Sequence, residues 1–265
     1  YVREKILGHG CNGLVYLAHA VNRPEQKVAI KEVVALNKSK VDWLAEFRSV
    51  LEMKGIPNTV RYLDLFFDDV SNRGSLVSEL CEGGDLLRFL QQRLSAPPIP
   101  EADLRDWTKS LLTVLLALQK NQLVHRDIAL RNILLDDEIV DSERRRVVKL
   151  GDFGLAKVLA NDRSILSKGW SVCLAPERTP SPASDVWSLG CCLHSLMCGI
   201  DPDEMDRHGQ AFAKLPPERL DEQRRKALVE RNYSPEFIAL VEAMMDPHPA
   251  KRLEPARGLD RLRER

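Results

Sequence analysis

Up to about position 80, apolar and polar residues alternate in short runs with a period of two, which is typical of β-strands. These runs are rich in β-branched and aromatic residues, and turn sequences such as Asn22-Arg23-Pro24 separate them. The pattern predicts strands at Tyr1–Leu7, Leu14–Ala20, Lys27–Val34, Arg61–Phe67 and Ser75–Leu80.

One segment within this region has a different period. Apolar residues at positions 41, 44, 47, 50 and 51 have helical spacing, and Ser39 precedes them as a candidate N-cap. The pattern therefore predicts a single helix, Val41–Met53, among the strands.

Beyond the sequence CEGG at positions 81–84, the period changes to that of helices. Leucines occur on all sides of the predicted helix Glu101–Gln119, which indicates that this helix is buried. Pro100 suits its first turn. A charged helix is expected to end the chain. The other predicted helices are Asp85–Leu94, Glu101–Gln119, Ser184–Cys198 and Pro235–Met245. The fold class is therefore α+β, with a small strand-rich part followed by a larger, mainly helical part.

The composition is that of an ordinary soluble globular protein, with 44% hydrophobic and 29% charged residues. Lys plus Arg and Asp plus Glu both number 39, so no net charge favours nucleic acid or an anionic membrane as a partner. The longest apolar stretch, around 111–118, is too short to cross a bilayer. We expect no nucleic-acid partner and no membrane insertion, and we expect the chain to be one domain of a longer protein.

The six cysteines indicate a reducing compartment. They include no CxxC pair and have no metal-ligand spacing with the histidines, so neither a zinc site nor a disulfide framework is predicted. We expect reduced thiols in a cytoplasmic protein, with the nucleus as the alternative location.

Three short motifs carry the functional signal. HRDIALRN at 125–132 is followed by DFG at 152–154 and APE at 175–177. Together they resemble the catalytic loop, magnesium-binding turn and activation-segment anchor of eukaryotic protein kinases. The resemblance implies the bilobal protein kinase fold in a single domain, residues 1–265. Its N-lobe would be a small antiparallel sheet with one main helix, at about 1–80. The hinge would be about 81–84, and a larger, mainly helical C-lobe would be about 85–265.

The sequence GHGCNGLV at 8–15 matches the glycine-rich pattern GxGxxGxV and lies between two predicted strands. A dinucleotide-binding fingerprint would instead join a strand to a helix. Glycine lets backbone amides approach phosphate oxygens, so the resemblance assigns Gly8, Gly10, Gly13 and Val15 to ATP binding. A plain glycine-rich hairpin is the alternative.

The resemblance assigns Lys31, in VAIK at 28–31, to the α- and β-phosphates of ATP, with Ala29 also in the cofactor-binding set. Glu46 on the predicted helix is the expected ion-pair partner of Lys31, and Glu52 is the second choice. The alternative is a solvated lysine on a strand.

The hinge of a protein kinase resembles the segment SELCEGGD at 78–85. The backbone groups of Glu79 and Cys81 would pair with adenine, and Asp85 completes the predicted cofactor-binding set. Ser78 would be an unusually small gatekeeper, which predicts an open pocket behind the adenine. An ordinary interlobe linker is the alternative.

The resemblance also assigns the catalytic residues. Asp127 would be the base that accepts the proton of the substrate hydroxyl, while Asn132 and Asp152 would ligate Mg²⁺. Arg131 joins the catalytic set, and a further hypothesis is that it selects acidic residues in a substrate peptide. His125 would stack with Phe153, and with Val50 and Tyr62, over an anchor at Asp185.

The positions that distinguish serine/threonine kinases from tyrosine kinases give conflicting indications of which hydroxyl accepts the phosphoryl group. Ala129 and Arg131 are typical of many tyrosine kinases, whereas DVWSLGC at 185–191 is typical of serine/threonine kinases. Trp170 and Cys173 match neither class. We expect a serine/threonine acceptor, with a tyrosine or dual-specificity kinase as the alternative.

Arg126 suggests a basic pocket that a phosphate on the activation segment would fill. The segment from Asp152 to Glu177 contains no tyrosine, so an upstream kinase would modify a serine, and we predict Ser164 or Ser167. The alternative is that these serines are ordinary loop residues.

A predicted hairpin in the helical part carries the basic run ERRR at 143–146 and the acidic run DDE at 136–138. A docking patch and a solvated turn with internally balanced charges both explain it, and the solvated turn is favoured.

The sequence therefore predicts a signalling protein kinase that transfers the γ-phosphoryl group of Mg²⁺-ATP to a protein substrate. A pseudokinase that binds nucleotide and partners without catalysis is the rival, although Lys31, Asp127 and the two metal ligands are all present. A kinase of small molecules is disfavoured, because Glu177 and Arg252 would pair to brace a peptide platform.

Overall fold

A computed structural model describes residues 1–10, 13–34, 55–93, 96–140, 143–153, 157–158, 173–200, 226 and 228–263. The chain divides into two compact units. The first comprises Tyr1–Gly55 and Thr59–Glu82, and the second comprises Ile56–Asn58 and Gly83–Arg265. After a short excursion into the second unit at Ile56–Asn58, the chain passes into it for the last time between Glu82 and Gly83.

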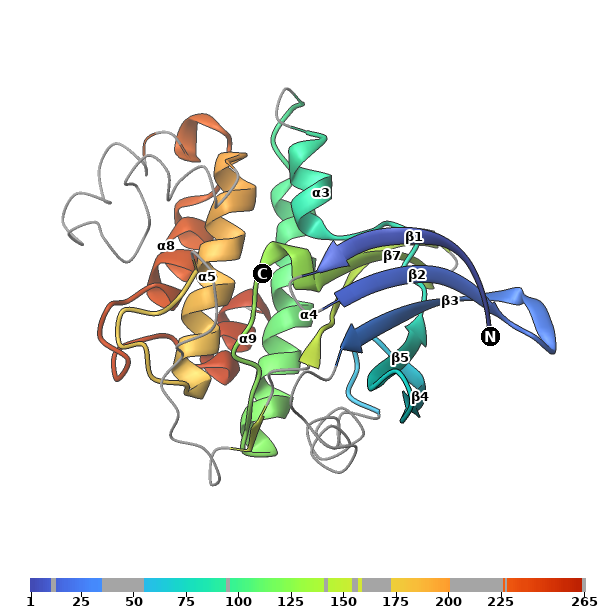
Figure 1. Cartoon of the computed structure of the whole chain (residues 1–265). Coiled ribbons are helices and arrows are strands. Elements are labelled where there is room, and N and C mark those ends of the chain that lie inside the picture. The colour runs from blue at the N-terminus through green and yellow to red at the C-terminus, as the bar shows by residue number, and fades with distance from the viewer. Residues whose placement is uncertain are drawn as a thin grey trace. The chain divides into compact units, whose positions relative to one another are not determined.

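The first unit is built on a five-stranded antiparallel sheet with the strand order β1-β2-β3-β5-β4, and β1, β2 and β3 run side by side in Figure 1. Its strands are β1 Val2–Gly10, β2 Gly13–Ala20, β3 Arg23–Val34, β4 Tyr62–Asp68 and β5 Arg73–Glu79. All five predicted strands are present. The predicted helix Val41–Met53 lies outside the described residues.

Several strand boundaries differ from the prediction by one or two residues, and two differ by more. β1 continues past Leu7, because the glycine-rich segment itself pairs with β2, with His9 opposite Leu14. β3 begins at Arg23 rather than Lys27, so the turn is shorter than Asn22-Arg23-Pro24. The pairing shifts register at the end of β2, and the bulge lets β3 contain Pro24, which lacks the N–H that a regular ladder needs.

The second unit is mainly helical, as the sequence predicts, and contains short strands. Its helices are α3 Leu86–Gln91, α4 Glu101–Lys120, the short 3₁₀ turn η1 Leu130–Asn132, α5 Pro182–Cys198, α8 Pro235–Met244 and α9 Pro255–Arg263. Its strands are β6 Leu123–Val124, β7 Ile133–Val140, β8 Glu143–Leu150 and β9 Lys157–Val158.

Helix α4 is the core helix of this unit and contacts α5, α9 and β8 (Figure 1). Leu104, Leu111, Leu112, Leu115 and Leu118 are buried, whereas Leu116 is half-buried, so the predicted burial is confirmed for most of these leucines but not on all sides of the helix. At its start the prediction is wrong by one position, because Pro100 is the N-cap and not a residue of the first turn.

Helix α3 is shorter than predicted. Asp85 precedes the helix as its N-cap, and its Oδ1 accepts a hydrogen bond from the backbone N–H of Arg88 at 2.8 Å. Aspartate is a preferred N-cap because its carboxylate satisfies an otherwise unpaired N–H of the first turn. The helix ends at Gln91, three residues before the predicted Leu94.

Helix α5 begins with a capping box. The Ser181 side chain accepts a hydrogen bond from the Ser184 N–H, and the Ser184 side chain accepts one from the Ser181 N–H. Most of the following helix is buried, including the carboxylate of Asp185 in its first turn. The cap fixes where α5 starts, and it therefore fixes the position of Asp185.

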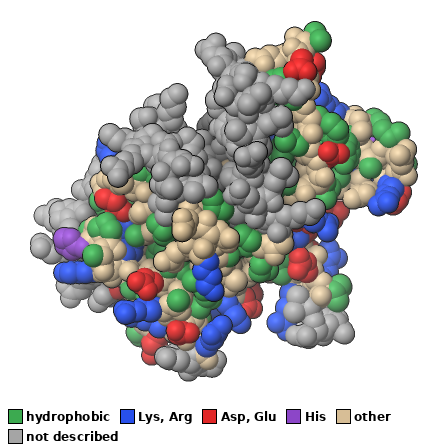
Figure 2. Space-filling model, turned by 90° about the horizontal axis from the view of Figure 1, so that it is seen from below, with side chains coloured by type: hydrophobic (Ala, Val, Ile, Leu, Met, Phe, Trp, Pro, Cys, Tyr) green, Lys and Arg blue, Asp and Glu red, His purple; other side chains and the backbone are tan. Residues whose placement is uncertain are grey.

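No helix in the described ranges is both long enough and apolar enough to span a membrane. On the face drawn in Figure 2, Lys and Arg side chains are interspersed with Asp and Glu side chains over the described residues. This mixture agrees with the formal net charge of zero.

Candidate active site

Asp127 lies at the centre of a hydrogen-bonded cluster in the second unit. Its Oδ1 accepts a hydrogen bond from Nη2 of Arg131 at 2.7 Å, and its Oδ2 accepts one from Nδ2 of Asn132 at 3.0 Å. Nδ2 of Asn132 also donates to the backbone oxygen of Asp127, at 2.7 Å. The turn η1 brings these side chains together, and each oxygen of the Asp127 carboxylate has a defined partner.

The His125 side chain links the loop that carries Asp127 to Gly151. Its Nε2 lies 3.0 Å from the backbone oxygen of Gly151, which can only accept, so Nε2 carries the hydrogen. Its Nδ1 accepts from the backbone N–H of Asp127 at 3.3 Å. The two contacts fix the orientation of the imidazole, and its ring contacts Phe153 edge-on at a centroid distance of 4.7 Å.

Asp185 anchors the same loop from α5. Its carboxylate accepts hydrogen bonds from the backbone N–H groups of His125, at 2.7 Å, and Arg126, at 3.0 Å. Arg126 has a φ of 72°, an unusual conformation for a residue with a side chain, which these contacts help to hold. Burial raises the pKa of Asp185, and the facing His125, Arg126 and backbone N–H groups oppose that rise. The predicted anchoring of His125 on Asp185 is present.

The hairpin of β7 and β8 brings Asn132 close to Asp152. Its first and last residues, Ile133 and Leu150, face each other, and Asn132 precedes the hairpin while Asp152 follows it. The backbone oxygen of Asn132 accepts from the N–H of Gly151 at 2.8 Å. The hairpin therefore brings the two predicted metal ligands near each other, although they are 20 residues apart in the sequence.

In the first unit, three predicted nucleotide-binding residues share one face of the sheet. Val28 and Ile30 of β3 are buried on the core side, so the alternate residues Ala29 and Lys31 point to the other face. Val15 of β2 is directly opposite Lys31 and shares that face. The register thus groups Val15, Ala29 and Lys31.

The glycine-rich segment forms the β1–β2 hairpin that the sequence predicts. Gly13 has a φ of 142°, and a Cβ there would lie 1.8 Å from the backbone oxygen of Glu32, so only glycine fits. At Gly8, in contrast, no described atom lies within 4 Å of such a Cβ. The space beside Gly8 is open, whereas Gly13 is required by packing against β3.

The predicted hinge residues have defined partners within their own units. The Glu79 side chain accepts from the backbone N–H of Arg61 at 2.8 Å, and Cys81 is buried. On the second unit's side, a Cβ at Gly83 would lie 2.7 Å from the backbone oxygen of Leu135, so β7 approaches too closely for any other residue. Asp85 caps α3 with Oδ1, a role that the sequence analysis missed.

Glu177 and Arg252 form the predicted ion pair. The Arg252 guanidinium donates to both Glu177 oxygens, at 2.7 and 3.0 Å, and its side chain is fully buried. It also donates to the backbone oxygens of Asp246 and Ala183, and it lies over the ring of Trp187 at 5.1 Å. The pair therefore ties the APE segment to α5 and to the chain before α9.

Cys173, which precedes the APE segment, is buried against α5. Its backbone oxygen accepts a hydrogen bond from Oγ of Ser188 at 2.8 Å. Burial raises the pKa of the neighbouring Cys191 thiol, and that of Cys192 is raised by a hydrogen bond with Cys173 and by burial. These environments favour the thiol form, which is a poor nucleophile, and none of the described cysteines forms a disulfide.

Several predicted functional residues lie outside the described residues. They are Glu46 and Glu52, Gly154, Val50 of the hydrophobic stack, Trp170, and the serines Ser164 and Ser167. Sequence reasoning missed Gly151, because its backbone oxygen carries no side-chain signal.

A comparison with family models decides the family. The model of the protein kinase domain matches residues 1–261. The chain belongs to the protein kinase domain family. Its bilobal α+β fold class, expected from the sequence, is thereby confirmed. The kinase domain has its HRD aspartate, its asparagine and its DFG aspartate at the positions described above.

Curated relatives of this kinase domain include the serine/threonine-protein kinase PLK4 of Xenopus tropicalis, 31% identical over 79% of the chain and 22% of that protein. The serine/threonine-protein kinases Nek8 of Danio rerio and ULK3 of Homo sapiens are each 28% identical, over 95% and 96% of the chain. The chain spans 35% of the first and 52% of the second. It therefore covers between about a fifth and a half of these relatives.

Proposed function

We propose that this kinase domain transfers the γ-phosphoryl group of ATP to serine or threonine hydroxyls of protein substrates. The observation that carries the proposal is the Asp127 carboxylate, held at both oxygens by Arg131 and Asn132 on a loop anchored by Asp185. The relatives' names supply the support for serine and threonine over tyrosine.

Asp127 acts as the base that orients the acceptor hydroxyl and takes its proton. A carboxylate serves this task when its orientation is fixed before the substrate arrives, since positioning then costs nothing during the reaction. Asn132 holds Oδ2 and Arg131 holds Oδ1, so the carboxylate plane cannot rotate freely.

The residues present fit a magnesium ion. Mg²⁺ prefers oxygen ligands and keeps several waters, so one or two protein side chains suffice. Both hydrogens of the Asn132 amide point at Asp127, which turns the amide oxygen away from it. Asn132 and Asp152 would hold the ion, which would neutralise charge on the phosphates. No group of three His, Cys, Asp or Glu side chains among the described residues offers a denser metal site.

The first unit would hold the nucleotide. Lys31 would bind the α- and β-phosphates, and Val15 and Ala29 would contact the base from the same sheet face. The open space beside Gly8 fits phosphate oxygens approaching the backbone of the glycine-rich segment, including Gly10. Glu79 and Cys81 would offer backbone groups to adenine, and Glu46 would pair with Lys31.

The two compact units correspond in this proposal to the lobes of one kinase domain. A single domain over residues 1–265 agrees with the family match, which reaches residue 261. We place the protein in the cytoplasm or nucleus, as a signalling enzyme whose partners are protein substrates rather than nucleic acid.

An upstream kinase would act on Ser164 or Ser167, because the activation segment contains no tyrosine. Arg126, beside the catalytic aspartate, is the candidate partner of that phosphate. Mass spectrometry of the active protein tests this: modification at either serine supports it, and a fully active protein without modification there contradicts it.

The function is tested by incubating the purified protein with Mg²⁺, γ-labelled ATP and a mixture of proteins. Label on a substrate protein that depends on Mg²⁺ supports the proposal. A protein whose melting temperature rises with Mg²⁺-ATP but which transfers no label, before and after treatment with an activating kinase, is a scaffold instead.

A further inference from the structure

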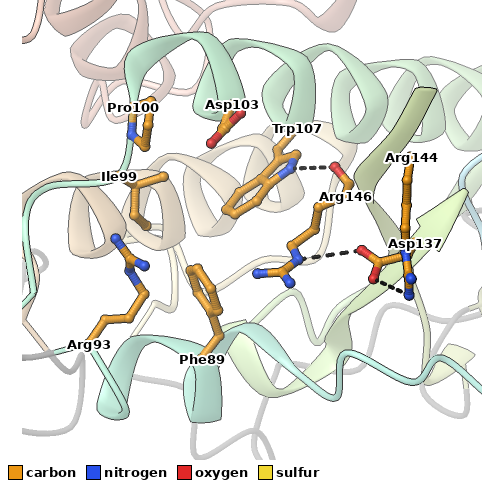
Figure 3. A pocket seen from close by; sticks show the side chains of 9 residues that line it. All are labelled: Phe89, Arg93, Ile99, Pro100, Asp103, Trp107, Asp137, Arg144 and Arg146. Carbon is orange, nitrogen blue, oxygen red and sulfur yellow. Dashed lines mark hydrogen bonds and ion pairs between the residues drawn. The ribbon is translucent and has the colours of Figure 1, made fainter. Parts of the chain in front are cut away.

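A pocket of about 350 Å³ lies in the second unit, between α3, the start of α4 and the β7–β8 hairpin (Figure 3). None of its lining residues belongs to the candidate active site. The pocket has an aromatic floor with arginine side chains at both ends, and the proposed catalysis uses none of these groups.

The floor of the pocket is apolar. Trp107 of α4 is buried and contacts Phe89 of α3 edge-on, with a ring-centroid distance of 5.9 Å. The indole Nε1–H donates to the backbone oxygen of Arg146 at 3.2 Å, so the only polar atom of this ring system is satisfied. Ile99 completes the floor (Figure 3). The floor therefore offers apolar surface and needs no hydrogen-bond partner from a ligand.

Two guanidinium groups flank the Phe89 ring. Cζ of Arg93 lies 5.2 Å from the ring centroid, and Cζ of Arg146 lies 5.8 Å from it. Arg93 donates through Nη2 to the backbone oxygen of Pro97, but its Nε is buried and has no hydrogen-bond partner among the described residues. Two cations around one ring repel each other, so an anion between them is favoured.

The charged side chains of the β7–β8 hairpin lie on two different faces. Side chains alternate along β8, and Arg144 and Arg146 line the pocket together with Asp137, to which they pair at 3.0 and 3.6 Å. On the other face, Lys149 pairs with Asp136 and Glu138. The run ERRR is therefore part of strand β8 and not of the turn itself.

The pocket face carries an excess of positive charge. Three arginines, Arg93, Arg144 and Arg146, face two carboxylates, those of Asp103 and Asp137. Asp137 is shared by two arginines, and each guanidinium has five N–H donors, so donors remain for a ligand. The opposite face of the hairpin is internally balanced, as the solvated-turn interpretation requires.

We propose that this pocket docks a short acidic segment of a protein partner, with one bulky apolar side chain on the aromatic floor and carboxylates reaching the arginines at either end. The apolar side chain of such a segment would pack on Phe89 and Trp107. Its flanking carboxylates would pair with Arg93 at one end and Arg144 at the other. Docking here would recruit a substrate or regulator to the kinase domain independently of phosphoryl transfer.

The test is fluorescence polarisation with a labelled synthetic peptide, with leucine and phenylalanine at its centre and glutamates on both sides. We expect saturable binding that weakens as salt is raised. Binding should fall at least tenfold in the exposed double variant Arg144→Glu/Arg146→Glu. The control is Arg145→Glu, which reverses one charge, half the change of the double variant, on the opposite face of the same strand and should bind as well as wild type.

The inactive variant Asp127→Asn should bind the peptide normally, which separates this inference from the proposed catalysis. Equal losses in Arg145→Glu and in the double variant would overturn the pocket as the site. Equal affinity for a peptide with serines in place of the central apolar residues would overturn the role of the aromatic floor. Preference for a lysine-flanked peptide, or for anionic vesicles over the peptide, would overturn the choice of partner.

Discussion

Nη2 of Arg131 lies 2.7 Å from Oδ1 of Asp127, so the residue four positions after Asp127 in the sequence holds the Asp127 carboxylate directly. Arg131 is more exposed than Asp127, with 39% of its side chain accessible against 12%. It thus reaches the carboxylate from the solvent side, while Asn132 holds the other oxygen from the buried side.

Replacing Arg131 with alanine should lower kcat about tenfold, because one charge-assisted hydrogen bond to the base is lost, at a cost of about 1.5 kcal/mol. The melting temperature should change little, since the side chain is exposed. Steady-state kinetics on a neutral peptide measures the effect, with Arg131→Lys as the control that keeps the charge. A raised KM for acidic peptides at unchanged kcat would instead show that Arg131 selects the substrate.

Breaking the Glu177–Arg252 pair should destabilise the protein strongly. Glu177→Ala leaves the buried Arg252 guanidinium without its counter-ion, at a cost of about 3–5 kcal/mol of unfolding free energy. Urea unfolding measures this cost. The double variant Glu177→Ala/Arg252→Met removes both charges and should be less destabilised than Glu177→Ala. If the loss of unfolding free energy in the double variant equals the sum of the losses in Glu177→Ala and Arg252→Met, the two residues are not coupled and this prediction is refuted.

Asp185→Asn should loosen the catalytic loop. An amide has one accepting oxygen, so one of the N–H groups of His125 and Arg126 loses its partner, at a cost of about 1–3 kcal/mol. We expect lower stability together with lower kcat, because the same carboxylate anchors Arg126, which has the left-handed φ of 72°. Asp106→Asn, an exposed change of the same kind on α4, is the control. Wild-type activity in Asp185→Asn would contradict the anchoring role.

Glu101 should make stability dependent on acid pH. Partial burial acts to raise the pKa of Glu101, but hydrogen bonds from Ser234 and Arg105 outweigh it, and the pKa lies below its usual value of 4.5. The folded state then resists protonation more than the unfolded state does. This stability is fully present above 4.5 and is lost as pH falls from there through the lower folded pKa.

The pH prediction is measured as the urea midpoint of wild type and Glu101→Gln across the acid range. The difference between them should shrink as pH falls. The exposed change Glu230→Gln should show no such trend. A wild-type advantage that stays constant down to acid pH would contradict the role of Glu101.

The sequence predicts the strands and helices well where each residue's environment follows a regular period. All five strands of the first sheet, and the buried face of α4, come from alternation and helical spacing alone. The predicted boundaries are wrong where the hydrophobic period does not decide them, as at β3, where a bulge accommodates Pro24, and at α3, where the local cap by Asp85 starts the helix.

The sequence identifies the candidate site residues, but it does not show which of them contact one another. Motif spacing identifies Asp127 and Asn132, yet a one-dimensional pattern contains no register, so it cannot show that the β7–β8 hairpin aligns Asn132 with Asp152. The same limit applies to the basic run at 143–146, because alternation separates Arg144 from Arg145 only once the partner strand is known.

We propose that Asp127 is the base for phosphoryl transfer to serine or threonine. The most direct measurement compares wild type with Asp127→Asn in a transfer assay with γ-labelled ATP, followed by identification of the labelled amino acid. We expect labelled serine or threonine, with a rate about 10²–10⁴-fold lower in Asp127→Asn at unchanged melting temperature. Equal rates in the two proteins, or label on tyrosine alone, would contradict it.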